Sequence, residues 1–212
     1  MKKKIVSLLF FIITITINCF SQSLNDNTEY FSKHSVDFLL EYLDIKYPDN
    51  LFNNFIYIGI KRQQLNFLHN GVLLKSYKVS TSKFGAGVIN NSNMTPIGLH
   101  KIEGKFGDNV PFGGIMKYKK YTGEVATIET KPVSTDMDII SSRIITIKGL
   151  EKGLNQGDNI DSYTRNIYIH GTNEEGLIGE PSSHGCIRMK NIDIMELYEL
   201  IDKDMLVIIL NN

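Results

Sequence analysis

The sequence lacks an excess of charge of either sign. Its 212 residues contain 23 Lys and Arg and 23 Asp and Glu, so the formal net charge is zero. A nucleic-acid-binding domain usually carries a basic face, so we expect no nucleic-acid partner. Internal repeats, linkers and low-complexity segments are also missing. The 42% hydrophobic and 22% charged residues are ordinary for a globular chain, and this length allows one domain with a substantial core.

A long transmembrane run is lacking too. Three lysines at positions 2–4 precede an apolar run of 13 residues, Ile5 to Ile17. At about 1.5 Å per residue, a helix of that length falls short of a hydrocarbon core of about 30 Å. A basic start, a short apolar core and a small residue at Ser21 are typical of a cleavable secretory signal. We therefore predict a signal peptide at 1–21 and export to the periplasm or cell envelope.

Cysteine is scarce, and each of the two has a different context. Cys19 lies in the predicted signal, where lipidation is the less favoured alternative because Asn18 does not fit the small-residue pattern of such sites. Removal of 1–21 takes away three lysines, so the mature chain has net charge −3, and Cys186 is its single thiol. No internal disulfide can then form. Cys186 is either a buried inert thiol or a reactive one.

The spacing of apolar residues predicts a mostly β domain preceded by a helix. Helical spacing marks a 22–50 extension, ending at Pro48, and strand signals begin after it, so 51–212 is expected to form the main domain. The helical stripe consists of Val36, Leu39, Leu40, Leu43 and Tyr47. Strands are predicted at Phe55–Ile60, around Leu65 and Phe67, at Val72–Ser80 after an Asn70-Gly71 hairpin signal, and at Ile144–Ile147, Asn166–Ile169 and Met205–Leu210. A late helix is indicated by Ile194, Leu197, Tyr198 and Ile201, whereas 81–142 shows only short apolar pieces.

Two segments near the end of the chain carry residues suited to nucleophilic chemistry. His170 ends a predicted strand, and the Gly- and Pro-containing loop after it can turn back towards Cys186. A neighbouring histidine can form an ion pair with a thiol or take its proton during attack. We therefore interpret Cys186 as a nucleophile and His170 as its base. His184, two residues from the thiol, is expected to brace the turn or a tetrahedral intermediate.

The glycines beside these residues suggest a backbone role. Gly185 lacks a Cβ, so a substrate carbonyl can approach, and the N–H groups of Gly185 and Cys186 are candidate oxyanion donors. We group Gly171, which follows His170, with this backbone set.

Two other kinds of chemistry are less favoured. His170, His184 and Cys186 are acceptable zinc ligands, but no fourth ligand is evident, so we expect no metal and no cofactor. Ser183 as a nucleophile is disfavoured, because no Gly-x-Ser-x-Gly elbow surrounds it.

The string from His170-Gly171 to Ser183-His184-Gly185-Cys186-Ile187-Arg188 resembles the signature of the L,D-transpeptidase catalytic domain, the YkuD-type family. Twelve residues separate His170 from Ser183, close to the spacing usual in that family. Val79-Ser80-Thr81 and Thr95-Pro96-Ile97-Gly98 also match family elements, and the resemblance extends over 54–210. Two features differ: some members have Asn in place of Arg188, and 106–142 resembles an insertion.

The resemblance implies a sandwich- or barrel-like β fold with a helix after Cys186, and cysteine-based acyl transfer. Such enzymes attack the third residue of a peptidoglycan stem peptide, usually meso-diaminopimelate, release terminal D-Ala, and pass the acyl group to an amine or to water. It therefore implies a tetrapeptide donor, an amine acceptor and an envelope-associated protein, which we expect to be a monomer.

The sequence allows more than one role for Arg188 and more than one activity for the protein. Arg188 is expected to bind a substrate carboxylate, with Ser183 as a second substrate contact; the alternative for Arg188 is an ion pair that fixes the turn. An L,D-carboxypeptidase or other hydrolase of the same linkages remains open, as does a catalytically silent cell-wall-binding domain.

Overall fold

The computed structural model describes residues 33–135 and 137–212. The predicted signal peptide at 1–21, including Cys19, lies outside the described residues, as does the first part of the 22–50 extension. No helix in the described ranges has both the length and the apolarity needed to span a membrane.

The described chain is built mainly of strands, which confirms the mostly β prediction. The strands are β1 (Asn54–Gly59), β2 (Gln64–His69), β3 (Val72–Ser80), β4 (Gly98–Phe106), β5 (Gly114–Lys117), β6 (Lys120–Val125), β7 (Ile140–Gly149), β8 (Tyr168–Thr172), β9 (Ile187–Met189) and β10 (Leu206–Leu210). The helices are α2 (Lys33–Lys46) and α3 (Asn191–Leu200), with short 3-10 turns η1 (Asp158–Ile160) and η2 (Glu175–Leu177).

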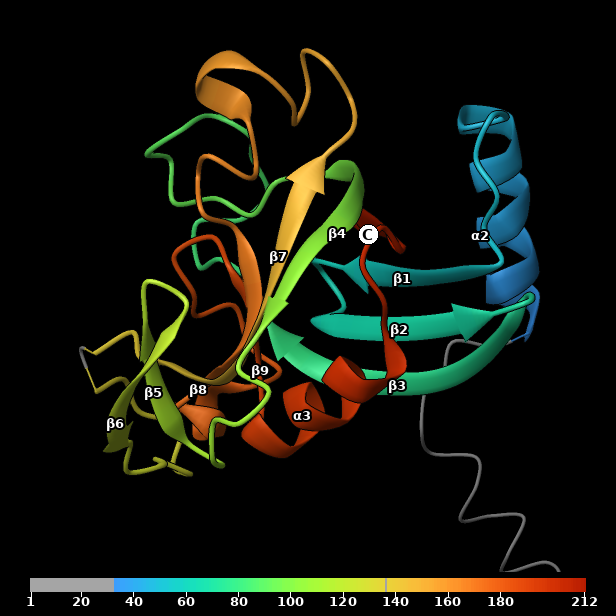
Figure 1. The fold of residues 1–212 in the computed structure, drawn as a ribbon. Coiled ribbons are helices and arrows are strands. Elements are labelled where there is room, and N and C mark those ends of the chain that lie inside the picture. Colours follow the sequence, from blue (N-terminus) through green and yellow to red (C-terminus); the bar gives the residue numbers. More distant parts are fainter. Residues whose placement is uncertain (1–32, 136) are drawn as a thin grey trace, which may run out of the picture.

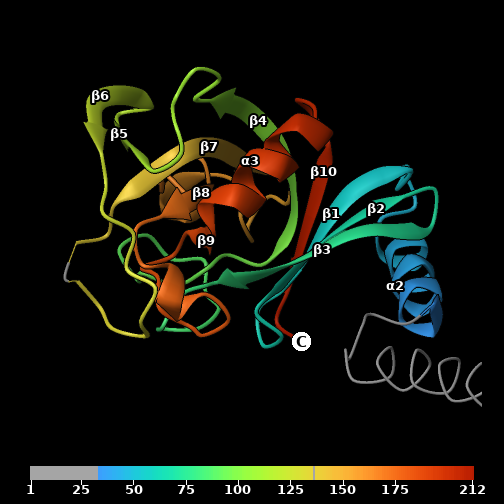
Figure 2. The ribbon, with the colours of Figure 1, turned by 90° about the horizontal axis from the view of Figure 1, so that it is seen from below.

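The strands form one sheet that closes on itself. Their order is β4-β10-β1-β2-β3-β9-β8-β7-β5-β6, and β4 also pairs with β7. This extra pairing closes eight strands into a barrel-like structure, from which the β5–β6 hairpin projects beyond β7. Figure 1 and Figure 2 show the hairpin and α2 at opposite ends of the molecule.

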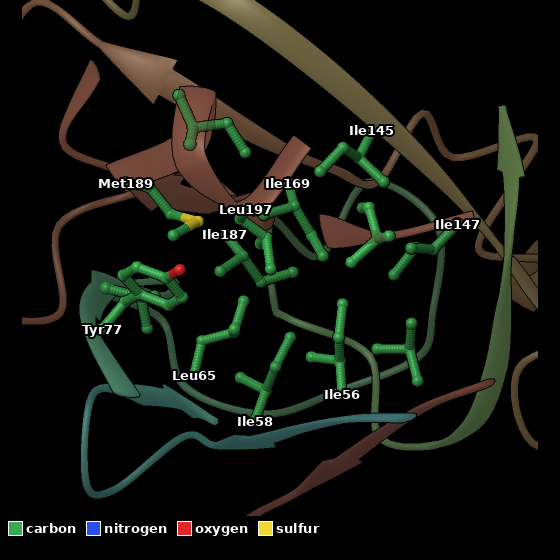
Figure 3. Close-up of a cluster of buried hydrophobic side chains, with 14 of the residues drawn as sticks. Ile56, Ile58, Leu65, Tyr77, Ile145, Ile147, Ile169, Ile187, Met189 and Leu197 are labelled. Carbon is green, nitrogen blue, oxygen red and sulfur yellow. The ribbon is translucent and has the colours of Figure 1, made fainter. Parts of the chain in front are cut away.

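The interior of this barrel is the main hydrophobic core. Side chains from β1, β2, β3, β7, β8, β9 and α3 point towards one another in Figure 3. On β8 and β9 the core residues are Ile169, Ile187 and Met189. Because successive side chains of a strand point to opposite faces, His170 and Arg188 lie on the outer face. The packing of the core thus determines which face carries the polar residues.

The predicted N-terminal helix is confirmed as α2, which packs outside the barrel. Its apolar stripe buries Val36, Leu39 and Leu43. These side chains join a second core with residues of β1, β2 and β10, including Phe55 and Ile208. The helix therefore covers the outer face of those strands.

The strand predictions succeeded where turn residues or apolar runs were clear. Asn70 and Gly71 have φ of 48° and 73°, as a tight hairpin turn requires, and β3 has the predicted bounds. The predicted strand at Asn166–Ile169 is shifted, because Asn166 has a positive φ of 56° and β8 begins at Tyr168. The 81–142 stretch was under-predicted, since it contains β4, β5 and β6.

Candidate active site

The structure brings the two motif segments together on the outer face of a parallel strand pair. In the register of β8 and β9, His170 lies opposite Arg188 and Ile169 opposite Ile187. Cys186 directly precedes β9, two residues before Arg188, so its side chain shares the outer face with His170. The loop after β8 thus turns back as its glycines predicted.

The thiol of Cys186 is half-buried and is held by backbone groups. The Tyr168 N–H lies 3.4 Å from Sγ and donates to it, and Sγ lies 3.5 Å from the Asn166 carbonyl oxygen, which accepts from the thiol. Burial raises the pKa of Cys186 to about 11, although the Tyr168 N–H and the nearby Arg188 and Arg165 act in the opposite direction. The resting thiol is therefore protonated at neutral pH.

The His170 ring is buried and fixed in one tautomer. The side chain is 1% exposed, and Nδ1 lies 2.8 Å from the carbonyl oxygen of Gly171. A carbonyl can only accept, so Nδ1 carries the hydrogen and Nε2 has the free lone pair. Burial also lowers the pKa of His170. The imidazole is therefore neutral at pH 7 and able to accept a proton through Nε2.

The thiol and the imidazole form a neutral pair in the resting protein. Within the part of the chain that the structure describes, no hydrogen bond joins His170 to Cys186. The raised pKa of the thiol and the lowered pKa of the imidazole both oppose a thiolate–imidazolium ion pair. Of the two modes considered from sequence, the geometry favours proton transfer during attack.

Gly171 supports the imidazole and permits close packing behind it. A Cβ at this position would lie 2.6 Å from the Ser141 carbonyl oxygen and 2.8 Å from Asn191 Oδ1. Only glycine fits between β7 and the start of α3 without movement of these groups. The Gly171 carbonyl accepts a hydrogen bond from His170 Nδ1 and orients the ring. The expected place of Gly171 in an oxyanion site stays a prediction.

The turn before β9 is fixed by its own hydrogen bonds. Ser183 Oγ donates to the Cys186 carbonyl at 2.6 Å and accepts from the Gly185 N–H at 3.2 Å. Thr95 Oγ1 donates to the Gly185 carbonyl at 3.0 Å, and Gly185 has a φ of 123°. These bonds favour a turn-fixing role for Ser183 over a substrate contact. They also engage the Gly185 N–H, which leaves the Cys186 N–H as the better oxyanion donor.

Arg188 is enclosed by two carboxylates. Its side chain is 2% exposed, with Nη2 2.6 Å from Asp138 and Nη1 2.9 Å from Glu174. The second oxygen of Asp138 lies 3.0 Å from Nδ1 of His184, which is half-exposed. This arrangement favours the alternative in which Arg188 fixes the turn, since its guanidinium already has two anionic partners. His184 is tied into the same network, as a bracing residue would be.

Sequence reasoning missed the acidic residues of this network and the nearby Arg165. Arg165 donates to the Met94 carbonyl at 2.7 Å and holds the loop beside the turn. Asp138 lies in 126–139, a segment between β6 and β7 with no strand period and no motif. Glu174 follows His170 by four residues. Only this short separation in the sequence could have indicated that Glu174 lies near the site.

Open space lies next to this network. A cavity of about 520 Å³ is bounded by the β5–β6 hairpin and residues 137–140, and Asp138 is one of its lining residues. A second cavity of about 510 Å³ lies between α2 and the ends of β1 and β10, and includes none of the motif residues. Among residues 33–135 and 137–212, no group of three or more His, Cys, Asp or Glu side chains is placed to hold a metal ion.

Comparison with solved structures finds distant similarity to L,D-transpeptidases. One from Mycobacterium smegmatis shares 15% identity, with 74% of this chain and 58% of that chain covered and a TM-score of 0.48. One from Mycobacterium tuberculosis H37Rv shares 16% identity over 75% and 58% of the two chains, with a TM-score of 0.45. One from Enterococcus faecium shares 12% identity over 76% and 50%, with a TM-score of 0.43. This chain thus spans between half and three fifths of these proteins.

The family assignment comes from a separate comparison. A search of curated proteins found no match. The family model of the L,D-transpeptidase catalytic domain, YkuD, matches residues 53–209, which include every strand except the last residue of β10 and all of the motif residues. The chain therefore belongs to the L,D-transpeptidase catalytic domain (YkuD) family.

Proposed function

We propose that this protein is an exported cysteine acyltransferase that acts on peptidoglycan stem peptides. The family is one of L,D-transpeptidases, whose substrates are such peptides, and the signal at 1–21 would deliver the chain to the cell envelope. We take 51–212 as the catalytic domain. The observation that carries the proposal is the placement of Cys186 and a neutral, oriented His170 on the same outer face of β8 and β9.

In the first step, Sγ of Cys186 attacks the carbonyl carbon of the third stem-peptide residue. His170 Nε2 takes the thiol proton as the S–C bond forms, and the Cys186 N–H donates to the developing oxyanion. The tetrahedral intermediate collapses when the C–N bond to terminal D-Ala breaks. His170 returns the proton to the leaving amine, and a thioester remains on Cys186.

In the second step, an acceptor amine attacks the thioester carbonyl. His170 takes a proton from that amine, the C–S bond breaks, and Cys186 regains its proton. The product is a new amide, either a 3→3 cross-link or an attachment to another amine. With water as the acceptor, the same sequence gives L,D-carboxypeptidase activity.

The neutral state of the pair suits this order of events. A half-buried thiol whose pKa is raised stays protonated, and a protonated thiol reacts little until a substrate carbonyl and His170 act together. A buried imidazole with a lowered pKa is unprotonated at neutral pH, so it can accept the proton when the S–C bond forms. Asp138, Glu174 and Arg188 then act as positioning residues that hold the turn bearing the thiol.

Incubation of the mature protein with a disaccharide-tetrapeptide, followed by mass spectrometry, tests the proposal. We expect a cross-linked dimer with loss of one D-Ala per bond, and no product from Cys186→Ala. His170→Ala should lower the rate, whereas His69→Ala, which changes an exposed histidine at the end of β2, should not. Tripeptide alone would establish the carboxypeptidase instead, and an active Cys186→Ala would overturn the covalent mechanism.

A further inference from the structure

The β5–β6 hairpin places one lysine among three aromatic rings. Lys119 Nζ lies 5.4 Å from the ring centroid of Phe106, 5.3 Å from that of Tyr163 and 5.6 Å from that of Tyr168. An ammonium group within about 6 Å of a ring centroid is attracted by the ring. No carboxylate of residues 33–135 or 137–212 pairs with Lys119. The rings are therefore the partners of this charge.

The turn between β5 and β6 directs Lys119 inward. Its two central residues, Tyr118 and Lys119, have a backbone conformation that these residue types rarely adopt. Tyr118 and Lys119 have φ of 49° and 64°, in the left-handed region. Such two-residue turns usually contain Asn and Gly, because other side chains adopt this conformation at a cost. Tyr118 is 97% exposed, whereas Lys119 is half-buried. This turn leaves the Tyr118 ring in solvent and brings the Lys119 ammonium to the rings.

The hairpin is attached to the barrel by few other contacts. β6 is exposed along its whole length, and one pair, Ile115 with Ser141, joins β5 to β7. Met116 adds a buried contact in the small core with Val110 and Ile144. Figure 1 and Figure 2 show the hairpin projecting at the edge of the sheet, beyond β7. None of the eight barrel strands pairs with β6, and only β7 pairs with β5, so displacement of the hairpin would leave the barrel closed.

The rings of Phe106, Tyr163 and Tyr168, here called the aromatic cage, adjoin the candidate nucleophile. The backbone N–H of Tyr168 donates to Cys186 Sγ, and the Tyr168 hydroxyl donates to Asn166 Oδ1 at 2.6 Å. The carbonyl of Asn166 accepts from the thiol. One wall of the cage is thus the residue whose backbone holds the thiol, so a group bound in the cage lies beside the reacting centre.

We propose that Phe106, Tyr163 and Tyr168 form a binding site for a primary alkylammonium group, which Lys119 occupies in the free protein. This inference rests on the proposed function, because a stem peptide with a side-chain amine would present such a group beside the thiol. The substrate ammonium displaces Lys119, and the hairpin swings away from the site. The rings recognise the charged group, so it is distinct from the neutral amine that attacks the thioester.

Binding of n-butylammonium tests the cage without any need for turnover. We expect the dissociation constant, measured from amide shifts in an NMR titration, to be at least about tenfold lower for Lys119→Ala and Lys119→Gln than for the wild type, since the tethered lysine no longer competes. Lys120→Ala, a matched change of an exposed lysine on the same hairpin, should bind as the wild type does. The neutral isostere 1-butanol should not bind.

A ring deletion completes the test. Adding Tyr163→Leu to Lys119→Ala should weaken n-butylammonium binding about fivefold or more, because one of the three faces is lost. Equal affinities in the wild type and both Lys119 variants, or equal binding of 1-butanol, would overturn the proposal. Inactivity towards the tetrapeptide with butylammonium binding as expected would contradict the proposed function and leave the cage standing.

Discussion

Asp138 and Arg188 form an ion pair of 2.6 Å, which joins the residues just before β7 to β9, the strand that follows Cys186. The same carboxylate pairs with His184 in the turn before that strand. Glu174, on the other side of the guanidinium, accepts from the backbone N–H and hydroxyl of Thr135. Two acids therefore connect Thr135 and Asp138, which precede β7, to the turn through one buried arginine.

The first prediction concerns the buried half of this network. Glu174→Gln should lower the free energy of unfolding by about 3 kcal/mol, because Arg188 would keep a buried charge with one partner fewer. Asp138→Asn should cost about 1 kcal/mol or less, since that carboxylate is 36% exposed. Urea unfolding measures both. Glu196→Gln, in an exposed pair with Lys75, is the control, and an equal effect of Glu174→Gln would contradict the buried ion pair.

The second prediction separates the two histidines through the reactivity of the thiol. The rate of Cys186 alkylation by iodoacetamide should rise with pH to a midpoint well above the free value of about 8.5, since burial raises the thiol pKa. His170→Ala should leave this midpoint unchanged, because no hydrogen bond joins the pair at rest, but slow acylation by about 10²–10⁴-fold.

His184→Ala is the matched comparison for that experiment. It should slow acylation by loss of the bracing contact to Asp138, again with little change in the midpoint. A wild-type midpoint below 8.5 that rises in His170→Ala would mean that a resting ion pair exists. A midpoint that moves only in His184→Ala would reverse the two roles.

The sequence predicted which residues form the candidate site, but it did not predict the residues around them. The glycines between His170 and Cys186 indicate a loop that turns back. The approach of these two residues could therefore be predicted from the local sequence. Asp138 reaches Arg188 across 50 positions of the chain, and no local pattern encodes that pairing. β5 and β6 were missed for a similar reason: β6 is exposed on both faces, so it lacks the alternation on which strand prediction depends.

The third prediction concerns the glycine behind the imidazole. Gly171→Ala should lower the free energy of unfolding by about 2 kcal/mol or more, because the added Cβ overlaps the Ser141 carbonyl and Asn191. Activity should fall as well, since movement of Gly171 disturbs its bond to His170. Gly153→Ala is the control: its Cβ meets nothing within 4 Å, so only its left-handed backbone costs about 1–2 kcal/mol. Activity and stability as in the wild type for Gly171→Ala would refute this packing argument.

The fourth prediction is a pH dependence of stability from a histidine outside the site. His100 is fully buried between the Gly98 carbonyl and Ser162 Oγ, and burial lowers its pKa to about 4. Its unfolded value is about 6.5, so the unfolded chain binds a proton that the folded protein excludes. Stability should therefore fall as the pH drops from 6.5 to 4, by about 3 kcal/mol from this group.

Urea unfolding at several pH values checks that dependence. His100→Gln should give a flatter decline of the free energy of unfolding between pH 6.5 and 4 than the wild type, whereas His69→Gln should leave the decline unchanged. An identical decline in all three proteins would contradict the role of His100 and would mean that carboxylates cause the loss of stability in acid.

The most direct test of covalent catalysis by Cys186 is the intact mass of the protein after reaction with a carbapenem. Opening of the β-lactam ring by the thiol expels no leaving group, so one thiol should gain the full mass of the compound. The account predicts a single adduct on the wild type, located by peptide mapping to Cys186 and missing from folded Cys186→Ala. Absence of an adduct on folded wild-type protein, or an equal adduct on Cys186→Ala, would contradict it.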